Sequence, residues 1–432
     1  MSDTKRRQPR RTAKKAIFLS TAIALTSLSA AHGPMTPALA DPGLTLTGAG
    51  ECTYPAKQIK GTPWSLQRVL FDQLWQHTKG IDKKTGRPVL VAVIDTGVDI
   101  KNPQLTDAVD TKLGFEVRKS GKNALEKGKK GDGTDDLVGH GTKVAGIIAA
   151  RPHPGTGFVG LAPEAKIIPI RQNDEKGSGT TDTMAEAIDK AVTRGARVIN
   201  ISQDTVKPLQ ANNNLERAIN NALEHDVVVV ASAGNDGLDG KVKKTYPAAY
   251  KGVLAVGSSD RNNERAPFSQ AGDFVGVAAP GVDMVSTVPG GGQCVDNGTS
   301  FSAPYVAGVA ALIRAKHPDW KQYQVVAQIE QTAERAVNAH DAYVGWGVVD
   351  PVRALTEDDH PIDHVTLDKS PARNVDAPTP APLALGETPQ ERKERFATYI
   401  LGGAALLVAM ITGAAAVLHE HRRRRGAATE HA

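Results

Sequence analysis

Between residues 89 and 335, short apolar runs rich in valine and isoleucine alternate with stretches whose apolar residues recur at helical spacing. Such runs are typical of strands buried on both faces of a sheet, and their alternation with helices favours an α/β fold with a mainly parallel sheet flanked by helices. Thr181 directly precedes the stretch expected as a helix at Asp182–Arg194, and threonine is a residue type that caps helix N-termini. The expected strands are Val89–Ile94, Lys166–Ile170, Arg197–Ile201, Val227–Ala231, Val253–Val256 and Phe274–Ala278, and the expected helices are His140–Ala150, Asp182–Arg194, Leu215–Glu224, Ser300–Lys316 and Tyr323–Arg335.

Two segments do not follow this alternation. Residues 41–88 form an N-terminal extension in which one amphipathic helix is expected at Trp64–His77. Ile100–Gly139 contains a run of lysines and arginines among several glycines. We interpret it as a solvated surface loop, with a functional basic patch as the alternative.

The charge of the chain is concentrated at its two ends. The whole chain carries a net charge of +5, of which residues 1–40 contribute +6 and residues 419–432 contribute +2. The remaining residues, 41–418, therefore carry −3. Because the positive charge lies outside the body of the protein, we expect no nucleic-acid partner.

The first 40 residues have the three parts of a secretory signal peptide. Met1–Lys15 is basic, Ala16–Ala31 is mostly apolar, and small residues precede Asp41. The alternative is an uncut signal anchor, but the apolar run is short for a span of about 20 residues. We expect cleavage after Ala40 and therefore an exported protein.

A second apolar run lies near the C-terminus. Phe396–Leu418 comprises 23 residues without a charged side chain, and a helix of that length reaches about 34 Å, enough to cross a bilayer. Arg422–Arg425 follow, and positive charge stays on the cytoplasmic side. We expect a single-pass cell-membrane protein with a cytoplasmic tail at 419–432 and an extracytoplasmic body. A buried core helix is the alternative.

The chain has two cysteines, Cys52 and Cys294. Disulfides persist in exported proteins, so one intrachain bridge between the N-terminal extension and the segment before Ser300 is expected. Two buried or unpaired thiols are the alternative.

Three segments carry residues suited to chemistry. Asp95 ends an apolar strand, His140 opens a helix of small residues, and Ser300 begins a long apolar helix. An imidazole oriented by a carboxylate can act as a general base, and the backbone N–H groups at a helix start favour a developing anion. Taken singly, these residues also fit a strand-end acid, a core or surface histidine and an N-cap serine.

Together the three segments resemble the signature blocks of the subtilase (S8) family. The strings are IDTGVD, GHGTKVAGIIA and GTSFSAPYVAGVAAL, and the chain order Asp, His, Ser is that of subtilisin. The resemblance covers about residues 89–354. It implies a subtilisin-like fold and a serine endopeptidase with Asp95, His140 and Ser300 as its triad.

The resemblance carries over to further positions. VVVVASAGNDG resembles the block that supplies the oxyanion-hole amide, which makes Asn235 the candidate, with Gly234 beside it as a substrate-binding residue. VINIS resembles the strand that pairs with substrate and ends at Ser202. The family usually continues with Leu-Gly, whereas this chain has Gln203-Asp204, so the usual broad apolar preference is not carried over. No cofactor or metal ligand is expected. The loop before Gly160 lacks the Asn-rich calcium-binding sequence of secreted relatives, and calcium binding stays open.

Within the family, GTPWSLQR at residues 61–68 resembles the start of the mycosins, membrane-anchored subtilases of actinobacterial type VII secretion systems. This resemblance implies protein substrates among exported proteins and association with a secretion membrane complex. Mycosins commonly have more than one disulfide, whereas this chain can form one. The expected organisation is a signal peptide at 1–40, an extension at 41–88, a peptidase domain at 89–357, a Pro-rich linker at 358–395, a membrane helix at 396–418 and a basic tail at 419–432.

Two other functions stay open at this point. The protein could be a structural subunit that stabilises a secretion complex, with proteolysis secondary. It could also be an anchored cell-surface subtilase unrelated to secretion.

Overall fold

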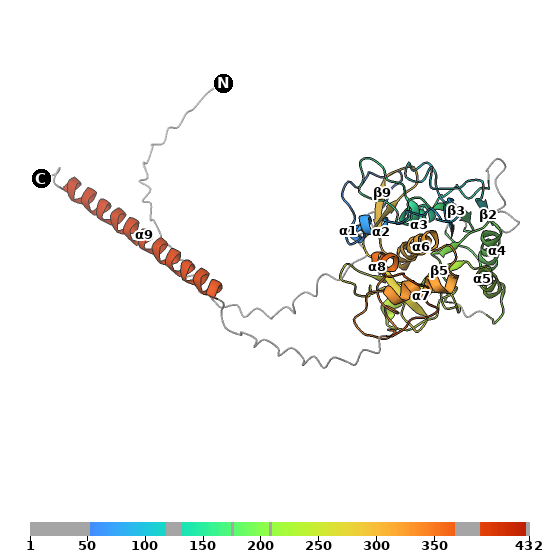
Figure 1. The fold of residues 1–432 in the computed structure, drawn as a ribbon. Helices are drawn as coiled ribbons and strands as arrows, with labels where there is room; N and C mark the ends of the chain where they lie inside the picture. The colour runs from blue at the N-terminus through green and yellow to red at the C-terminus, as the bar shows by residue number, and fades with distance from the viewer. Residues whose placement is uncertain (1–51, 118–130, 174–176, 207–209, 368–388, 429–432) are drawn as a thin grey trace, which may run out of the picture. The chain divides into compact units, whose positions relative to one another are not determined.

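The computed structural model describes residues 52–117, 131–173, 177–206, 210–367 and 389–428. The chain divides into two compact units, residues 1–367 and 368–432 (Figure 1). The expected signal peptide, the basic run at 118–130 and residues 368–388 of the expected linker lie outside the described residues.

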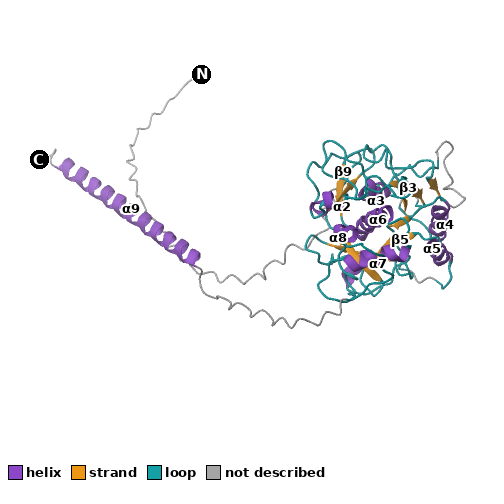
Figure 2. Ribbon diagram, viewed as in Figure 1, coloured by secondary structure: helices purple, strands orange, loops and turns teal. Residues whose placement is uncertain are grey.

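A seven-stranded sheet forms the centre of the first unit (Figure 2), and its neighbouring strands are all parallel. The strand order is β2-β3-β1-β4-β5-β6-β7, so the chain leaves β1 in one direction to β3 and then returns to β4 on its other side. Sites form at such a reversal, beyond the carboxyl ends of the strands. The strands are β1 (Leu90–Asp95), β2 (Phe115–Glu116), β3 (Lys166–Arg171), β4 (Val198–Ile201), β5 (Val228–Ser232), β6 (Leu254–Ser259) and β7 (Val275–Pro280).

Helices cover both faces of the sheet. Side chains alternate along each strand, so that Val91 and Val93 of β1 join one hydrophobic cluster and Ala92 and Ile94 join the other. The first cluster contains α3 (His140–Ala149) and α6 (Thr299–Lys316), and the second contains α4 (Thr181–Thr193) and α5 (Asn214–Glu224). This arrangement confirms the predicted α/β fold. The other helices of the first unit are α1 (Trp64–Gln67), α2 (Phe71–Leu74), α7 (Gln322–Thr332) and α8 (Pro351–Thr356).

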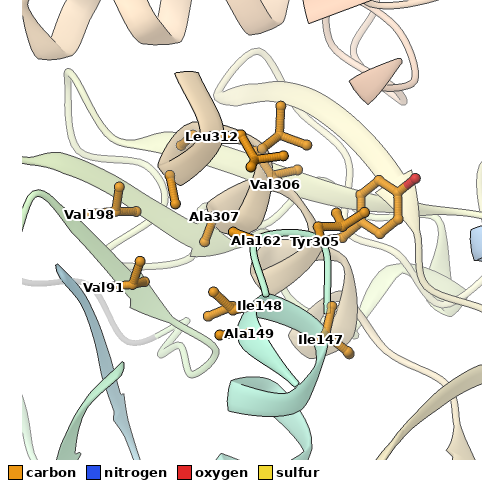
Figure 3. Packing of buried hydrophobic residues seen from close by; sticks show 14 of the residues in the cluster. Val91, Ile147, Ile148, Ala149, Ala162, Val198, Tyr305, Val306, Ala307 and Leu312 are labelled. Carbon is orange, nitrogen blue, oxygen red and sulfur yellow. The ribbon is translucent and has the colours of Figure 1, made fainter. Parts of the chain in front are cut away.

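Helix α6 is buried along almost its whole length. Figure 3 shows Val306, Ala307 and Leu312 packed among residues of α3 and the sheet. Small residues permit this close packing, since a Cβ on Gly308 would lie 2.9 Å from Cβ of Leu161. The tight packing fixes the position of the first turn of α6, which contains Ser300.

The prediction of one helix at Trp64–His77 is wrong. The chain forms α1 and α2, separated by residues 68–70, and the ψ of 85° at Leu70 is not helical. The break has a tertiary cause. It allows the indole of Trp64 to donate to the Val282 carbonyl (2.9 Å) and the indole of Trp75 to donate to the Leu161 carbonyl (2.8 Å).

Two further details differ from the sequence predictions. The residue that caps α4 is Thr180, one position before Thr181, because its hydroxyl and that of Thr183 form a reciprocal capping box. The part of Ile100–Gly139 before residue 118 is not a solvated loop. Leu105 and Ala108 are fully buried there, and Phe115 lies in strand β2.

The N-terminal extension packs along a hairpin that the sequence did not predict, β8 (Met284–Thr287) and β9 (Gln293–Asp296). The disulfide between Cys52 and Cys294 joins the two. Backbone bonds continue the contact, with Ala56 donating to Gly291 (3.0 Å) and Gln293 donating to Lys57 (3.2 Å). The extension is therefore fixed to the strand that leads into Ser300.

The second unit contains one long helix, α9 (Pro389–Ala428). Within its segment Glu391–Glu420, an 18-residue window has a mean hydropathy of 2.2, so the helix is long and apolar enough to cross a membrane by length and composition. The helix begins within the segment expected as linker and extends into the expected tail. Toward the end of the first unit, Asp358 is buried and pairs with Lys316 at 2.6 Å.

Candidate active site

Asp95 is the last residue of β1, at the point where the strand order reverses. Its side chain is fully buried. The Oδ1 atom accepts hydrogen bonds from the backbone N–H of Thr96 (2.8 Å) and from Nδ1 of His140 (2.7 Å). Among the described residues Oδ2 has no hydrogen-bond partner. A buried carboxylate is costly without a cation, so this site favours a positive charge on the imidazole.

His140 is the first residue of α3 and follows Gly139, whose φ of 86° is left-handed. The hydrogen bond to Asp95 assigns the proton to Nδ1 and leaves Nε2 free to accept a proton. Its ring lies 5.6 Å from that of Phe301, centroid to centroid, so the starts of α3 and α6 adjoin.

A second carboxylate, Asp136, holds this helix start in place, and sequence reasoning missed it. Its Oδ1 accepts from the N–H of Gly139 (2.7 Å) and the hydroxyl of Thr96 (2.8 Å), and its Oδ2 accepts from the N–H (2.9 Å) and the hydroxyl of Thr142. An acid shortly before a helix is a local signal that could have indicated the residue.

The two carboxylates tune the imidazole. Burial opposes the charged form of His140, but the charge and hydrogen bond of Asp95 and the charge of Asp136 outweigh it, and the pKa of His140 is raised above its ordinary value. Burial also raises the pKa of Asp136, although the hydrogen bonds from Thr142, Gly139 and Thr96 oppose this.

Ser300 is the second residue of α6. Its hydroxyl donates to the carbonyl of Ser202 (3.1 Å), and the hydroxyl of Ser202 donates to the carbonyl of Ser300 (2.8 Å). The amide of Asn200 donates to the Ser202 hydroxyl (2.9 Å). These bonds join the end of β4 to the first turn of α6. In this rotamer the Ser300 hydroxyl bonds to Ser202 and not to His140.

Asn235 lies on the other side of Ser300. Its Oδ1 accepts from the N–H (2.9 Å) and the hydroxyl (3.0 Å) of Thr299, and these two donors fix the orientation of the amide. A Cβ placed on Gly298 would lie 3.7 Å from both Nδ2 of Asn235 and the backbone N of Ser300. The two N–H donors therefore border the same small space.

Gly234 completes the surroundings. Its N–H donates to the Thr299 hydroxyl (3.3 Å), and its φ of 102° is a conformation that glycine adopts most easily. The structure thus brings the six predicted site residues to the first turn of α6 and the adjoining end of β1. The two predicted cysteines form a disulfide that joins the N-terminal extension to strand β9.

Comparison with known proteins shows which family the chain resembles in sequence and fold. The model of the subtilase family matches residues 86–347. Subtilisin Savinase of Lederbergia lenta is 37% identical over 274 residues, which cover 63% of this chain and 92% of the relative. Subtilisin E of Bacillus subtilis (strain 168) is 36% identical over 291 residues, which cover 67% of this chain and 70% of the relative.

Among solved structures, the MycP3 protease from the type VII (ESX-3) secretion system superposes with a TM-score of 0.60 and 33% identity, covering 70% of this chain and 92% of that one. MycP1 from Mycobacterium smegmatis gives a TM-score of 0.58 and 30% identity, covering 78% and 91%. The family match extends over more than half of the chain and the fold is that of these proteases, so the chain belongs to the subtilase family of serine proteases.

Proposed function

We propose that the protein is a serine endopeptidase in which Ser300 is the nucleophile, His140 the general base and Asp95 the group that orients the base. The observation that carries this assignment is the 2.7 Å bond between the buried Asp95 and His140 Nδ1, beside the first turn of α6. The bond leaves Nε2 as the proton acceptor. The negative charges that raise the pKa of His140, those of Asp95 and Asp136, stabilise the imidazolium formed during attack.

The reaction requires one local movement. The Ser300 hydroxyl must rotate from the Ser202 carbonyl toward His140, since catalytic hydrogen bonds often form only with substrate present. Its oxygen then attacks the peptide carbonyl while its proton passes to His140. The protonated His140 next gives this proton to the leaving amine. Water hydrolyses the acyl-enzyme by the same steps.

The negative charge on the carbonyl oxygen is stabilised by Nδ2 of Asn235 and the N–H of Ser300. Support comes from the equal 3.7 Å distances of both donors from the Gly298 position. Ser202 and Gly234 lie on the two sides of the nucleophile, where the backbone of an extended substrate would bind.

We further propose a mycosin-like role: an extracytoplasmic protease anchored in the cell membrane, with a cytoplasmic C-terminus, that cleaves exported proteins beside a type VII secretion complex. The similarity to MycP3 and MycP1, proteins of such systems, supports this role. The apolar helix and the arginines at 422–425 support the anchor and its orientation. The disulfide fits an oxidising compartment.

Labelling with a fluorophosphonate probe tests the peptidase assignment. The full chain, purified in detergent, should be labelled, and the variants Ser300→Ala and His140→Ala should not. In the probe reaction the Ser300 oxygen bonds to phosphorus, fluoride leaves and the hydroxyl proton passes to His140. A folded protein that is not labelled would contradict the assignment.

A secretion assay tests the cellular role. In cells that lack the protein, we expect Ser300→Ala to leave exported substrates uncleaved and to restore secretion no better than deletion of residues 389–432. MycP1 is described as an essential component of its secretion system, so a structural role is the second candidate. Loss of secretion after deletion of residues 389–432, but not with Ser300→Ala, would favour that structural role.

A further inference from the structure

Asp204 carries a carboxylate next to the proposed nucleophile that the mechanism does not use. It follows Ser202 by two residues, and its Oδ2 lies 3.0 Å from the position that a Cβ of Gly234 would occupy. Ser202 and Gly234 both bond to the first turn of α6. Asp204 therefore belongs to one of the two segments that contact the first turn of α6, and its carboxylate lies against the other.

A neighbouring segment, residues 245–246, holds this carboxylate in position. Thr205 and Tyr246 exchange two backbone hydrogen bonds of 3.0 Å, which place Asp204 beside Thr245. The Thr245 hydroxyl donates to the carbonyl of Ala233 (2.7 Å). We call these three segments, residues 202–205, 233–235 and 245–246, the Asp204 face.

Asp204 has no partner of opposite charge in the part of the chain that the structure describes. The residue as a whole is exposed, so a cation on a substrate can reach it. Partial burial of the carboxylate, together with the negative charge of Asp236, raises the pKa of Asp204 to about 6. At pH 8 the carboxylate is still ionised. An unpaired charge beside a second acid gives the folded domain no stabilising contact, which is typical of a site that receives its partner from a ligand.

The geometry of attack places one substrate side chain against this face. The carbonyl under attack must lie at Ser300 with its oxygen toward Asn235, the residue after Gly234. The side chain of the residue that supplies this carbonyl, P1, begins two bonds away. The absence of a Cβ on Gly234 lets the Asp204 carboxylate approach the backbone beside Asn235, since a Cβ there would lie 3.0 Å from Oδ2. A long side chain with a terminal cation can reach this carboxylate and pair with it.

We propose that Asp204 makes this peptidase selective for lysine or arginine at P1, through an ion pair with the substrate cation. The inference rests on the proposed function, since it requires Ser300 to attack a peptide carbonyl. Charge-assisted hydrogen bonds of this kind correspond to a preference of about tenfold to a hundredfold over an uncharged side chain of similar length.

Two peptide aldehydes that differ only at P1 test this selectivity. Acetyl-Leu-Leu-argininal and acetyl-Leu-Leu-norleucinal are titrated against fluorophosphonate labelling of the full chain in detergent at pH 8. In each case the Ser300 oxygen adds to the aldehyde carbon, the carbonyl electron pair moves onto its oxygen, and the hydroxyl proton is transferred through His140 to the adduct. The argininal should protect Ser300 at a concentration at least about tenfold lower than the norleucinal requires.

The variant Asp204→Asn should remove this difference, so that the two aldehydes protect Ser300 of the variant at equal concentrations. Asp239→Asn is the matched control, because it changes the net charge equally at an exposed position that pairs with Lys243 (2.9 Å). Equal protection by the two aldehydes, better protection by norleucinal, or protection by neither would overturn the P1 assignment while labelling still supports the peptidase. Absence of labelling in the wild-type chain would instead contradict the peptidase itself.

Discussion

Replacement of Asp136 by asparagine tests how the general base is held. The Oδ1 atom of Asp136 accepts from Thr96 and from the start of α3, and an amide oxygen can keep those bonds. The Oδ2 atom accepts from the N–H and the hydroxyl of Thr142, and an amide nitrogen cannot. Two donors would then face a third donor inside the protein.

The magnitude follows from these bonds. A hydrogen bond to a charged group contributes about 1.5–3 kcal/mol, and the Thr142 hydroxyl can rotate toward another acceptor. We therefore expect Asp136→Asn to lower the free energy of unfolding by about 3 kcal/mol. In a domain of this size that corresponds to a fall in Tm of about 5 °C.

The same substitution changes the charge near the base. The negative charge of Asp136 raises the pKa of His140, so its loss should lower that pKa. Probe labelling requires neutral His140 and therefore falls as pH drops through this pKa. The acid limb of the labelling rate should move to lower pH in Asp136→Asn, with labelling at high pH retained in the folded variant.

Asp132→Asn is the control, because Asp132 belongs to the same loop and its side chain, among the described residues, bonds only to Thr134 in its own turn (3.1 Å to the N–H). It should leave the acid limb unchanged and alter Tm by less than about 2 °C. A Tm of Asp136→Asn equal to that of the wild type would refute the hydrogen-bond argument. A lower Tm with an unmoved acid limb would refute the argument from charge.

Three further outcomes are expected. Asn235→Asp keeps an oxygen for the cap of α6 but removes the Nδ2 donor, so peptide hydrolysis should fall by about 10²–10³-fold with little change in Tm; an unchanged rate would exclude the amide from the oxyanion site. The preference for the argininal over the norleucinal in protecting Ser300 should decline as pH falls through about 6, because burial and the charge of Asp236 raise the pKa of Asp204 to about 6 and Asp204 loses its charge below it; a constant preference from pH 5 to 8 would contradict this. Replacement of Cys52 and Cys294 together by serine opens a loop of 242 residues and should reduce the unfolding free energy by up to about 5 kcal/mol, measured by thermal unfolding against the reduced and oxidised wild type; equal stability of all three would show that the extension is held without the bridge.

The sequence by itself determined the layered fold and the identity of the candidate triad. Strand β1 could be predicted because apolar residues fill every position before Asp95 in a strand that is buried on both faces, and this signal is local. Asp95, His140 and Ser300 could be selected because each stands at the edge of an element within a distinctive string. Residue type and short-range spacing were enough for both inferences.

Only the tertiary structure decided how these elements meet. Trp64 and Trp75 bond to distant carbonyls and split a helix that local periodicity favoured. Asp136 became part of the site through bonds to Thr96, 40 residues earlier. Asp204 acquired its place beside Gly234 because β4 and β5 are neighbours in the sheet. Contacts between segments far apart in the chain depend on strand order and side-chain packing, which no local pattern encodes.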